Sequence, residues 1–220
     1  MTRREWRVPV GLILLSLVPV VAGASRVTEL STGPEMTPGN ARFVADPLPV
    51  VVHIVGATVY CLLGAFQFVP SLRRHRWHRL AGRLLVPCGL AAALSGLWMT
   101  LAYDLPAHDG TLVNAFRLVF GAAMALAILL GLAAALRRDF TRHRAWMARG
   151  YAIGLGAGTQ AFTHAPYLIM SGGEQPGANG RAVLMLAGWL INLAVAEWAL
   201  RRPARGARSR PAHQPPVTAG

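Results

Sequence analysis

The sequence predicts an all-α protein, a polytopic bundle of about six transmembrane helices with a four-helix core built from two tandem helical hairpins. Of the 220 residues, 54% are hydrophobic and only 14% are charged, which is too few to cover a water-soluble domain of this size. The apolar residues fall into blocks of about 20, the length that carries a helix across a hydrocarbon core of ~30 Å. The blocks are interpreted as helices because a helix satisfies its own backbone polar groups in lipid, and because the alternating polarity of barrel strands is missing.

Six apolar blocks follow one another along the chain. They occupy residues 8–25, 49–70, 80–103, 112–136, 145–170 and 181–200. Residues 1–25 thus form a first transmembrane helix, 26–48 a polar outer loop, and 49–200 a membrane domain of five helices. Residues 201–220 contain mainly Arg, Pro and Ala without apolar periodicity, which predicts a disordered basic tail.

The first block fits two interpretations. Arg3 and Arg4, the apolar stretch and the sequence Ala22-Gly23-Ala24 resemble a signal peptide with a small-residue cleavage site. Left intact, the block is a transmembrane helix, which we favour. Cleaved, it would leave five spans with the same topology.

The distribution of arginines predicts the orientation. All 22 basic residues are arginine, and 18 of them lie near the N-terminus, around the turns after the second and fourth blocks, or at the C-terminus. Most acidic residues lie in the opposite loops: Glu29, Glu35, Asp46, Asp104, Asp109 and Glu174. The positive-inside rule therefore places both termini in the cytoplasm. Because the arginines cluster between apolar blocks, the net charge of +13 does not indicate nucleic-acid binding. The expected partners are the lipid bilayer and, at the cytoplasmic arginines, anionic lipid head groups.

The second and third blocks resemble the fourth and fifth. His78-Arg79, followed by Arg83, begins the third block, and His143-Arg144, followed by Arg149, begins the fifth. These matched pairs predict two hairpins related by an axis along the membrane normal, with the first and last helices outside the core.

Ionisable residues inside a membrane are costly, so they mark candidate sites. Three lie at similar depth toward the outer face: His53, Arg117 and His164. Others lie toward the inner face: His78, His143, Arg83 and Arg149. One hypothesis is b-type haem, because helical bundles hold haem between imidazoles and pair its propionates with arginine. His53 and His164 would then ligate the iron of an outer haem, and His78 with His143 that of an inner one.

Two other functions compete with haem binding and electron transfer. In the first, Arg117 and the two outer histidines line the polar cavity of a transporter or small-molecule binder. In the second, the protein is a non-catalytic membrane partner, and its histidines only form hydrogen bonds between helices. No catalytic triad is visible, so no catalytic residue is assigned, and an enzymatic role would be redox chemistry. The sequence leaves substrate and oligomeric state open.

Particular motifs resemble a known family. His53, the segment GAFQF at residues 64–68 and the run RRHRWHRLAGR at 73–83 resemble the bacterial membrane family called domain of unknown function 2306. The run RHRAWMAR at 142–149 resembles its His-Arg-x-Trp-Met-x-Arg motif. The resemblance covers roughly residues 49–200 and implies a multi-span protein of the bacterial plasma membrane without an established activity. A more distant likeness to the cytochrome b-561 class implies four core helices carrying histidines for two haems, but residues 112–136 contain no histidine.

Overall fold

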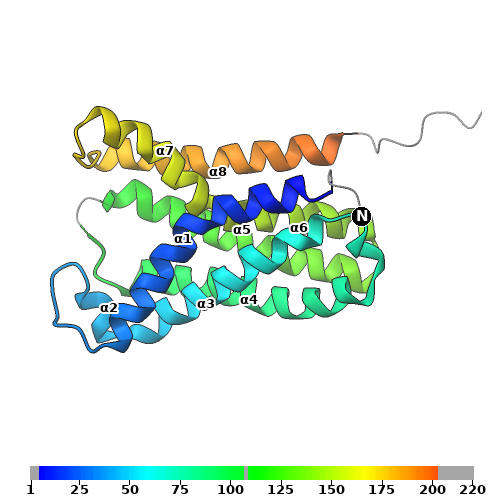
Figure 1. Cartoon of the computed structure of the whole chain (residues 1–220), viewed down its shortest axis with the longest axis horizontal. Coiled ribbons are helices and arrows are strands. Elements are labelled where there is room, and N and C mark those ends of the chain that lie inside the picture. The colour runs from blue at the N-terminus through cyan, green and yellow to red at the C-terminus, as the bar shows by residue number, and fades with distance from the viewer. Residues whose placement is uncertain (1–4, 107–108, 203–220) are drawn as a thin grey trace, which may run out of the picture.

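Every regular element in the computed structural model is helical, and the structure describes residues 5–106 and 109–202 (Figure 1). The five long helices are α1 (Arg7–Ser31), α3 (Pro47–Ala65), α4 (Arg76–Ala102), α5 (Gly110–Leu136) and α8 (Ala178–Arg201). The shorter elements are α2 (Ala41–Ala45), the 3-10 turns η1 (Phe66–Phe68) and η2 (Leu72–Arg74), α6 (Phe140–Gly154) and α7 (Gly156–Met170). The predicted all-α class is confirmed for this part of the chain. Most of the predicted basic tail, residues 203–220, lies outside the described residues.

The five long helices are long and apolar enough to cross a membrane. In the most apolar window of each, at most 33% of the residues are buried inside the protein. Large apolar side chains such as Leu101, Val119 and Val183 are instead exposed on the outside of the bundle. Apolar surface of this extent is stable against lipid rather than water. The chain is therefore a membrane protein with several apolar helices.

The fifth predicted span is not one continuous helix. Block 145–170 is divided at Leu155 into α6 and α7, each of 15 residues. A helix of that length reaches only about 22 Å, less than the ~30 Å of the hydrocarbon core. The prediction of six continuous spanning helices is therefore not confirmed, and five are present among the described residues.

The helices pack as a ring of four with two more outside it. α3 packs against α4, α5 against α6, α4 against α5, and α3 against α6. α1 lies against α3 and α7, and α8 lies against α5, α6 and α7. The predicted symmetry between two hairpins stays a prediction, because the second pair contains the break at Leu155.

The two ends of the bundle differ in composition. At one end, on the right in Figure 1, lie the start of α1, the turn at 66–75, the turn at 137–139 and the end of α8. We call this the arginine-rich end, because these segments and the starts of α4 and α6 that follow the two turns are rich in arginine. The other end, on the left, contains α2, residues 103–106 that follow α4, and the loop at 171–177, and we call it the α2 end.

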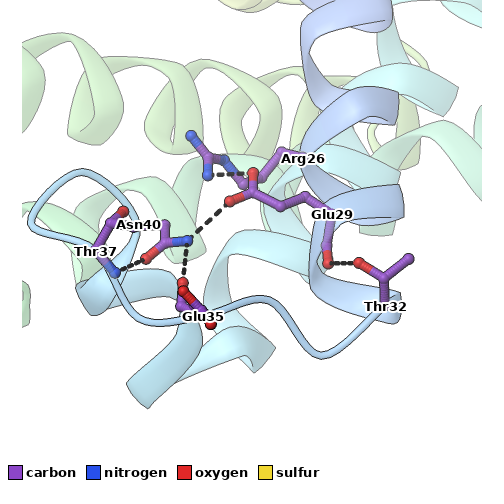
Figure 2. A network of polar contacts seen from close by, with 6 residues as sticks. All are labelled: Arg26, Glu29, Thr32, Glu35, Thr37 and Asn40. Carbon is purple, nitrogen blue, oxygen red and sulfur yellow. Dashed lines mark hydrogen bonds and ion pairs between the residues drawn. The ribbon is translucent and has the colours of Figure 1, made fainter.

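A polar network orders the segment between α1 and α3 (Figure 2). Asn40 is only 5% exposed, and its side-chain amide donates to Glu29 Oε1 at 3.0 Å and to the Glu35 carbonyl at 3.1 Å. Its Oδ1 accepts the Thr37 N–H at 2.7 Å, while Arg26 pairs with Glu29. Residues 26–48, predicted to be a polar outer loop, therefore begin with the last turns of α1 and include α2. This network holds α2 over one end of the bundle.

Candidate functional site

The bundle encloses a cavity of about 410 Å³, which we call the bundle cavity. Every α-helix in the described part of the chain contributes to its wall, and so do residues 103–106 after α4 and Asp109 before α5. Most lining side chains are apolar, among them Phe120, Met124, Ile153, Met185 and Trp189. The polar exceptions include His53, Arg42, Arg117, Asp109 and Gln160. A largely apolar cavity with a few convergent polar groups is typical of small-molecule sites, whose volumes run from roughly 300 to 1,000 Å³.

His53 presents one free ring nitrogen. Its Nδ1 lies 2.8 Å from the Ala92 carbonyl oxygen and 3.4 Å from Ser95 Oγ. Because a carbonyl oxygen only accepts, Nδ1 carries a proton and donates it. In the neutral ring, Nε2 is then a hydrogen-bond acceptor, and it has no partner among the described residues. A ligand in the bundle cavity could donate a hydrogen bond to this atom.

A carboxylate between two arginines closes the α2 end. Asp109 precedes α5, and its side chain is 3% exposed. Its two oxygens accept from Arg117 Nη1 at 2.7 Å and from Arg181 Nε at 2.8 Å, which joins α5 to α8. Burial alone would raise the pKa of Asp109, but the hydrogen bonds and charges of the two arginines outweigh it and hold the pKa below its ordinary value.

Arg42 brings a positive charge without an ion-pair partner among the described residues. Its guanidinium lies 4.4 Å from the centre of the Phe43 ring, and Arg26 lies 4.7 Å from the same ring. Of these two arginines, only Arg42 lines the bundle cavity. Burial lowers the pKa of Arg42; Asp109 opposes this, while Arg26 and Arg117 add to it. The α2 end of the cavity therefore has more positive than negative charge.

The break between α6 and α7 forms part of the cavity wall. Ile153 and Gly154 at the end of α6 and Ala157 at the start of α7 all line it. The break is fixed by close packing, because a Cβ on Gly156 would overlap the Trp189 ring of α8 and one on Gly158 would overlap the Leu15 carbonyl of α1. Interrupted helices form the substrate sites of many membrane transporters, since their ends present unpaired backbone groups to the ligand.

The structure does not bring His164 into this cavity. Its Nδ1 donates within its own helix to the Gln160 carbonyl at 2.7 Å, and its Nε2 is buried without a partner among the described residues. α1 packs against both α3, which carries His53, and α7, which carries His164, and of these two histidines only His53 lines the cavity. The structure therefore gives no support to a haem held between His53 and His164. In the described ranges, no group of three His, Cys, Asp or Glu side chains is placed to hold a metal ion.

The other candidates lie at the arginine-rich end. His78 is close enough to His143 and Arg73 for their charges to interact, and His143 Nδ1 lies 2.9 Å from the Gly131 carbonyl. Arg149 is engaged by Glu197 of α8 through Nε at 2.5 Å and Nη2 at 3.2 Å. Arg83 is exposed on α4. None of these four predicted residues lines the bundle cavity.

Sequence reasoning found His53 and Arg117 but missed most of the remaining polar wall. Arg42 and Asp109 lie in segments that were interpreted as connecting loops. Arg181, which pairs with Asp109 but does not line the cavity, was taken only as the start of the last helix. One local signal for the break was present. The run Gly154-Leu155-Gly156 lies near the middle of an apolar block, where glycine weakens a helix.

Comparison with known proteins gives one match. A family model described as "Predicted membrane protein (DUF2306)" matches residues 50–200, which is more than half of the chain. No curated protein matches the chain. No solved structure matches it either.

Proposed function

Because the chain belongs to DUF2306, a family described only as a predicted membrane protein, we propose its function from the bundle cavity: the protein binds a small amphiphilic anion within the membrane. The observation that carries the proposal is the polarity of the cavity. Arg42 and Arg117 lie at its α2 end, while Phe120, Met124 and Trp189 supply an apolar wall. A ligand with an anionic head group near the arginines and an apolar tail against this wall would match both parts of the cavity.

The positive end favours an anion over a cation of the same size. Asp109 already neutralises part of the charge through Arg117 and Arg181, but Arg42 lies beside the cavity with the Phe43 ring against its guanidinium and without an ion-pair partner among the described residues. A charged head group inside a low-dielectric wall interacts strongly with such a guanidinium, and arginine matches the geometry of carboxylate, sulfonate or phosphate oxygens. His53 Nε2 adds an acceptor for a hydroxyl group.

The interrupted helix favours a carrier over a static lipid site. The break at Leu155 lies in the cavity wall, and a short pair of helices changes its relative angle more easily than one continuous helix. We therefore propose that α6 and α7 together complete a sixth crossing and that ligand binding is coupled to their relative position. Haem is not part of this proposal, because the two outer histidines do not share the cavity.

We also propose an orientation. The start of α1 and the end of α8 lie at the arginine-rich end, which the positive-inside rule assigns to the cytoplasm of a bacterial inner membrane. Exposed arginines at that end would contact anionic head groups of the surrounding lipid.

Calorimetric titration tests the proposed ligand class. The purified protein, in nanodiscs of neutral phosphatidylcholine, is titrated with hexanesulfonate, methanesulfonate and hexyltrimethylammonium. We expect measurable binding of hexanesulfonate and at least tenfold weaker binding of the other two, since one lacks the tail and the other reverses the charge.

Two arginine variants supply the matched control. Arg42→Gln removes the cavity-lining guanidinium and should weaken hexanesulfonate binding at least fivefold. Arg26→Gln removes the second guanidinium that lies against the Phe43 ring. Arg26 does not line the cavity, so its loss should change the affinity less than twofold. Equal binding of the anionic and cationic amphiphiles, or equal effects of the two variants, would contradict the proposal.

A further inference from the structure

The arginine-rich end contains three buried polar atoms without hydrogen-bond partners among the described residues. They are Gln67 Nε2, Ser71 Oγ and His78 Nδ1, and all three belong to the turn between α3 and α4 or to the first turn of α4. An unsatisfied buried polar atom costs roughly 1–3 kcal/mol, so a native protein normally supplies a partner. Each of these atoms can donate a hydrogen bond: the amide nitrogen of Gln67, the hydroxyl of Ser71, and the ring nitrogen of His78 when it carries a proton.

The turn that carries these donors is folded tightly on itself. Arg73 Nε donates to the Gln67 carbonyl at 3.4 Å, and its Nη2 donates to the Phe68 carbonyl at 3.2 Å. The backbone N–H of His75 donates to the Leu72 carbonyl at 3.1 Å. η2 packs against both η1 and α4, so residues 66–78 form one compact unit.

Among the described residues, the charges that act on Arg73 and His78 in this unit are positive, and no carboxylate is one of them. The charged groups that act on His78 are His143 and Arg73, and the one that acts on Arg73 is Arg144 of the other turn. Asp139 pairs instead with Arg142, and Glu197 pairs with Arg149. Burial, and to a lesser degree Arg144, lowers the pKa of Arg73, as expected for a guanidinium that lacks a counter-ion.

One carboxylate at this end, that of Glu5 just before α1, could in principle balance these charges. Glu5 also has a buried oxygen without a partner among the described residues, and the neighbouring Trp6 contacts Phe66 at 6.0 Å between ring centres. Glu5 is not among the groups that act on Arg73 or His78, so it is not their counter-ion.

We infer that the arginine-rich end has a binding site for a phosphate group, formed by Gln67, Ser71 and His78 with Arg73 and Arg144. Several hydrogen-bond donors and two guanidiniums on neighbouring segments are the groups that bind a tetrahedral oxyanion. The side chains of Arg73 and Arg144 are exposed, which leaves an approach from the aqueous side. The first turn of α4 adds the positive end of a helix dipole. The phosphate can come from inorganic phosphate or from a lipid head group, and the site is independent of the ligand proposed for the bundle cavity.

The test separates the two sources. Full-length protein in phosphatidylcholine nanodiscs is titrated with inorganic phosphate by calorimetry, and native mass spectrometry counts phosphatidylglycerol retained by protein from mixed-lipid nanodiscs. Binding of inorganic phosphate identifies a free anion. Retention of phosphatidylglycerol without binding of inorganic phosphate identifies a lipid head group. If wild-type protein binds neither, the inference is overturned.

Two pairs of arginines give the site its matched control. Arg73→Gln with Arg144→Gln should weaken binding or retention at least tenfold. Arg76→Gln with Arg79→Gln removes the same charge from exposed positions on the same segment and should change it less than twofold. Equal effects of the two pairs would overturn the inference in favour of diffuse attraction to basic surface.

The buried donors give a second and more specific readout. Gln67→Met with Ser71→Ala removes two unsatisfied polar atoms, so the ligand-free protein should melt at the same temperature or higher. The same variant should bind at least fivefold more weakly. A variant that melts lower and binds normally would show that these side chains have a structural role only, which overturns the inference.

Discussion

Gly158→Ala is expected to lower the melting temperature of the purified protein by at least about 5 °C. A Cβ at this position would overlap the backbone carbonyl oxygen of Leu15 in α1. A carbonyl cannot rotate away as a flexible side chain can, so α1 and α7 must separate. Overpacking of this kind costs about 1–3 kcal/mol or more, and each kcal/mol lowers the melting temperature of a chain of this size by about 2–4 °C. Small residues often set such close approaches between transmembrane helices.

The control for this substitution is another glycine. Gly82 lies in α4, and nothing lies within 4 Å of a Cβ added there. Because alanine is a better helix former, Gly82→Ala should leave the melting temperature unchanged or raise it slightly. Circular dichroism during heating in detergent measures both variants. If Gly158→Ala melts like the wild-type protein, α7 does not pack against α1 as described.

Asp109→Asn is expected to be the most destabilising single change at the α2 end, lowering the melting temperature by about 10 °C. It removes the charge that the side chains of Arg117 and Arg181 share, and these are only 25% and 23% exposed. Breaking a buried ion pair by removing one partner costs about 3–5 kcal/mol, because the remaining charges are left uncompensated. Asp104→Asn changes an exposed carboxylate in the same turn and should have little effect.

The same ion pair predicts a dependence on pH. The pKa of folded Asp109 is below its ordinary value of about 3.9, so its carboxylate stabilises the fold at any pH above that value. This contribution is lost as the pH falls below about 4, through the lower pKa of the folded state. Between pH 5 and pH 3 the melting temperature of the wild-type protein should therefore fall further than that of Asp109→Asn, which has no carboxylate at this position to protonate. Parallel curves for the two proteins would contradict the assignment of Asp109 as the shared counter-ion.

The sequence was sufficient to predict the features that depend on composition alone. Apolar blocks of about 20 residues predicted the long helices, because length and hydropathy alone decide which segments are stable in lipid. The arginine clusters predicted which turns lie together, and these turns share one end of the bundle. His53 and Arg117 were found because an ionisable residue inside an apolar block is conspicuous without any knowledge of its neighbours.

The structural features that the sequence did not predict depend on which helices are neighbours in the fold. The block around Leu155 is continuously apolar, and its break follows from close packing of Gly156 on Trp189 and of Gly158 on Leu15, which are contacts over long sequence separations. His164 was predicted to lie at about the same depth as His53, but depth does not determine which side of a helix faces the cavity. Likewise, the pairing of Asp109 with Arg181 joins residues 72 positions apart.

The measurement that tests the bundle cavity most directly is hexanesulfonate binding after the cavity is filled. Ala57 of α3 lines the cavity, whereas Val55 on the same helix is 54% exposed on the outside of the bundle. If the cavity is the binding site, titration calorimetry in phosphatidylcholine nanodiscs will show affinity at least tenfold lower for Ala57→Phe and unchanged for Val55→Phe. Wild-type affinity in a folded Ala57→Phe protein would show that the amphiphile binds elsewhere.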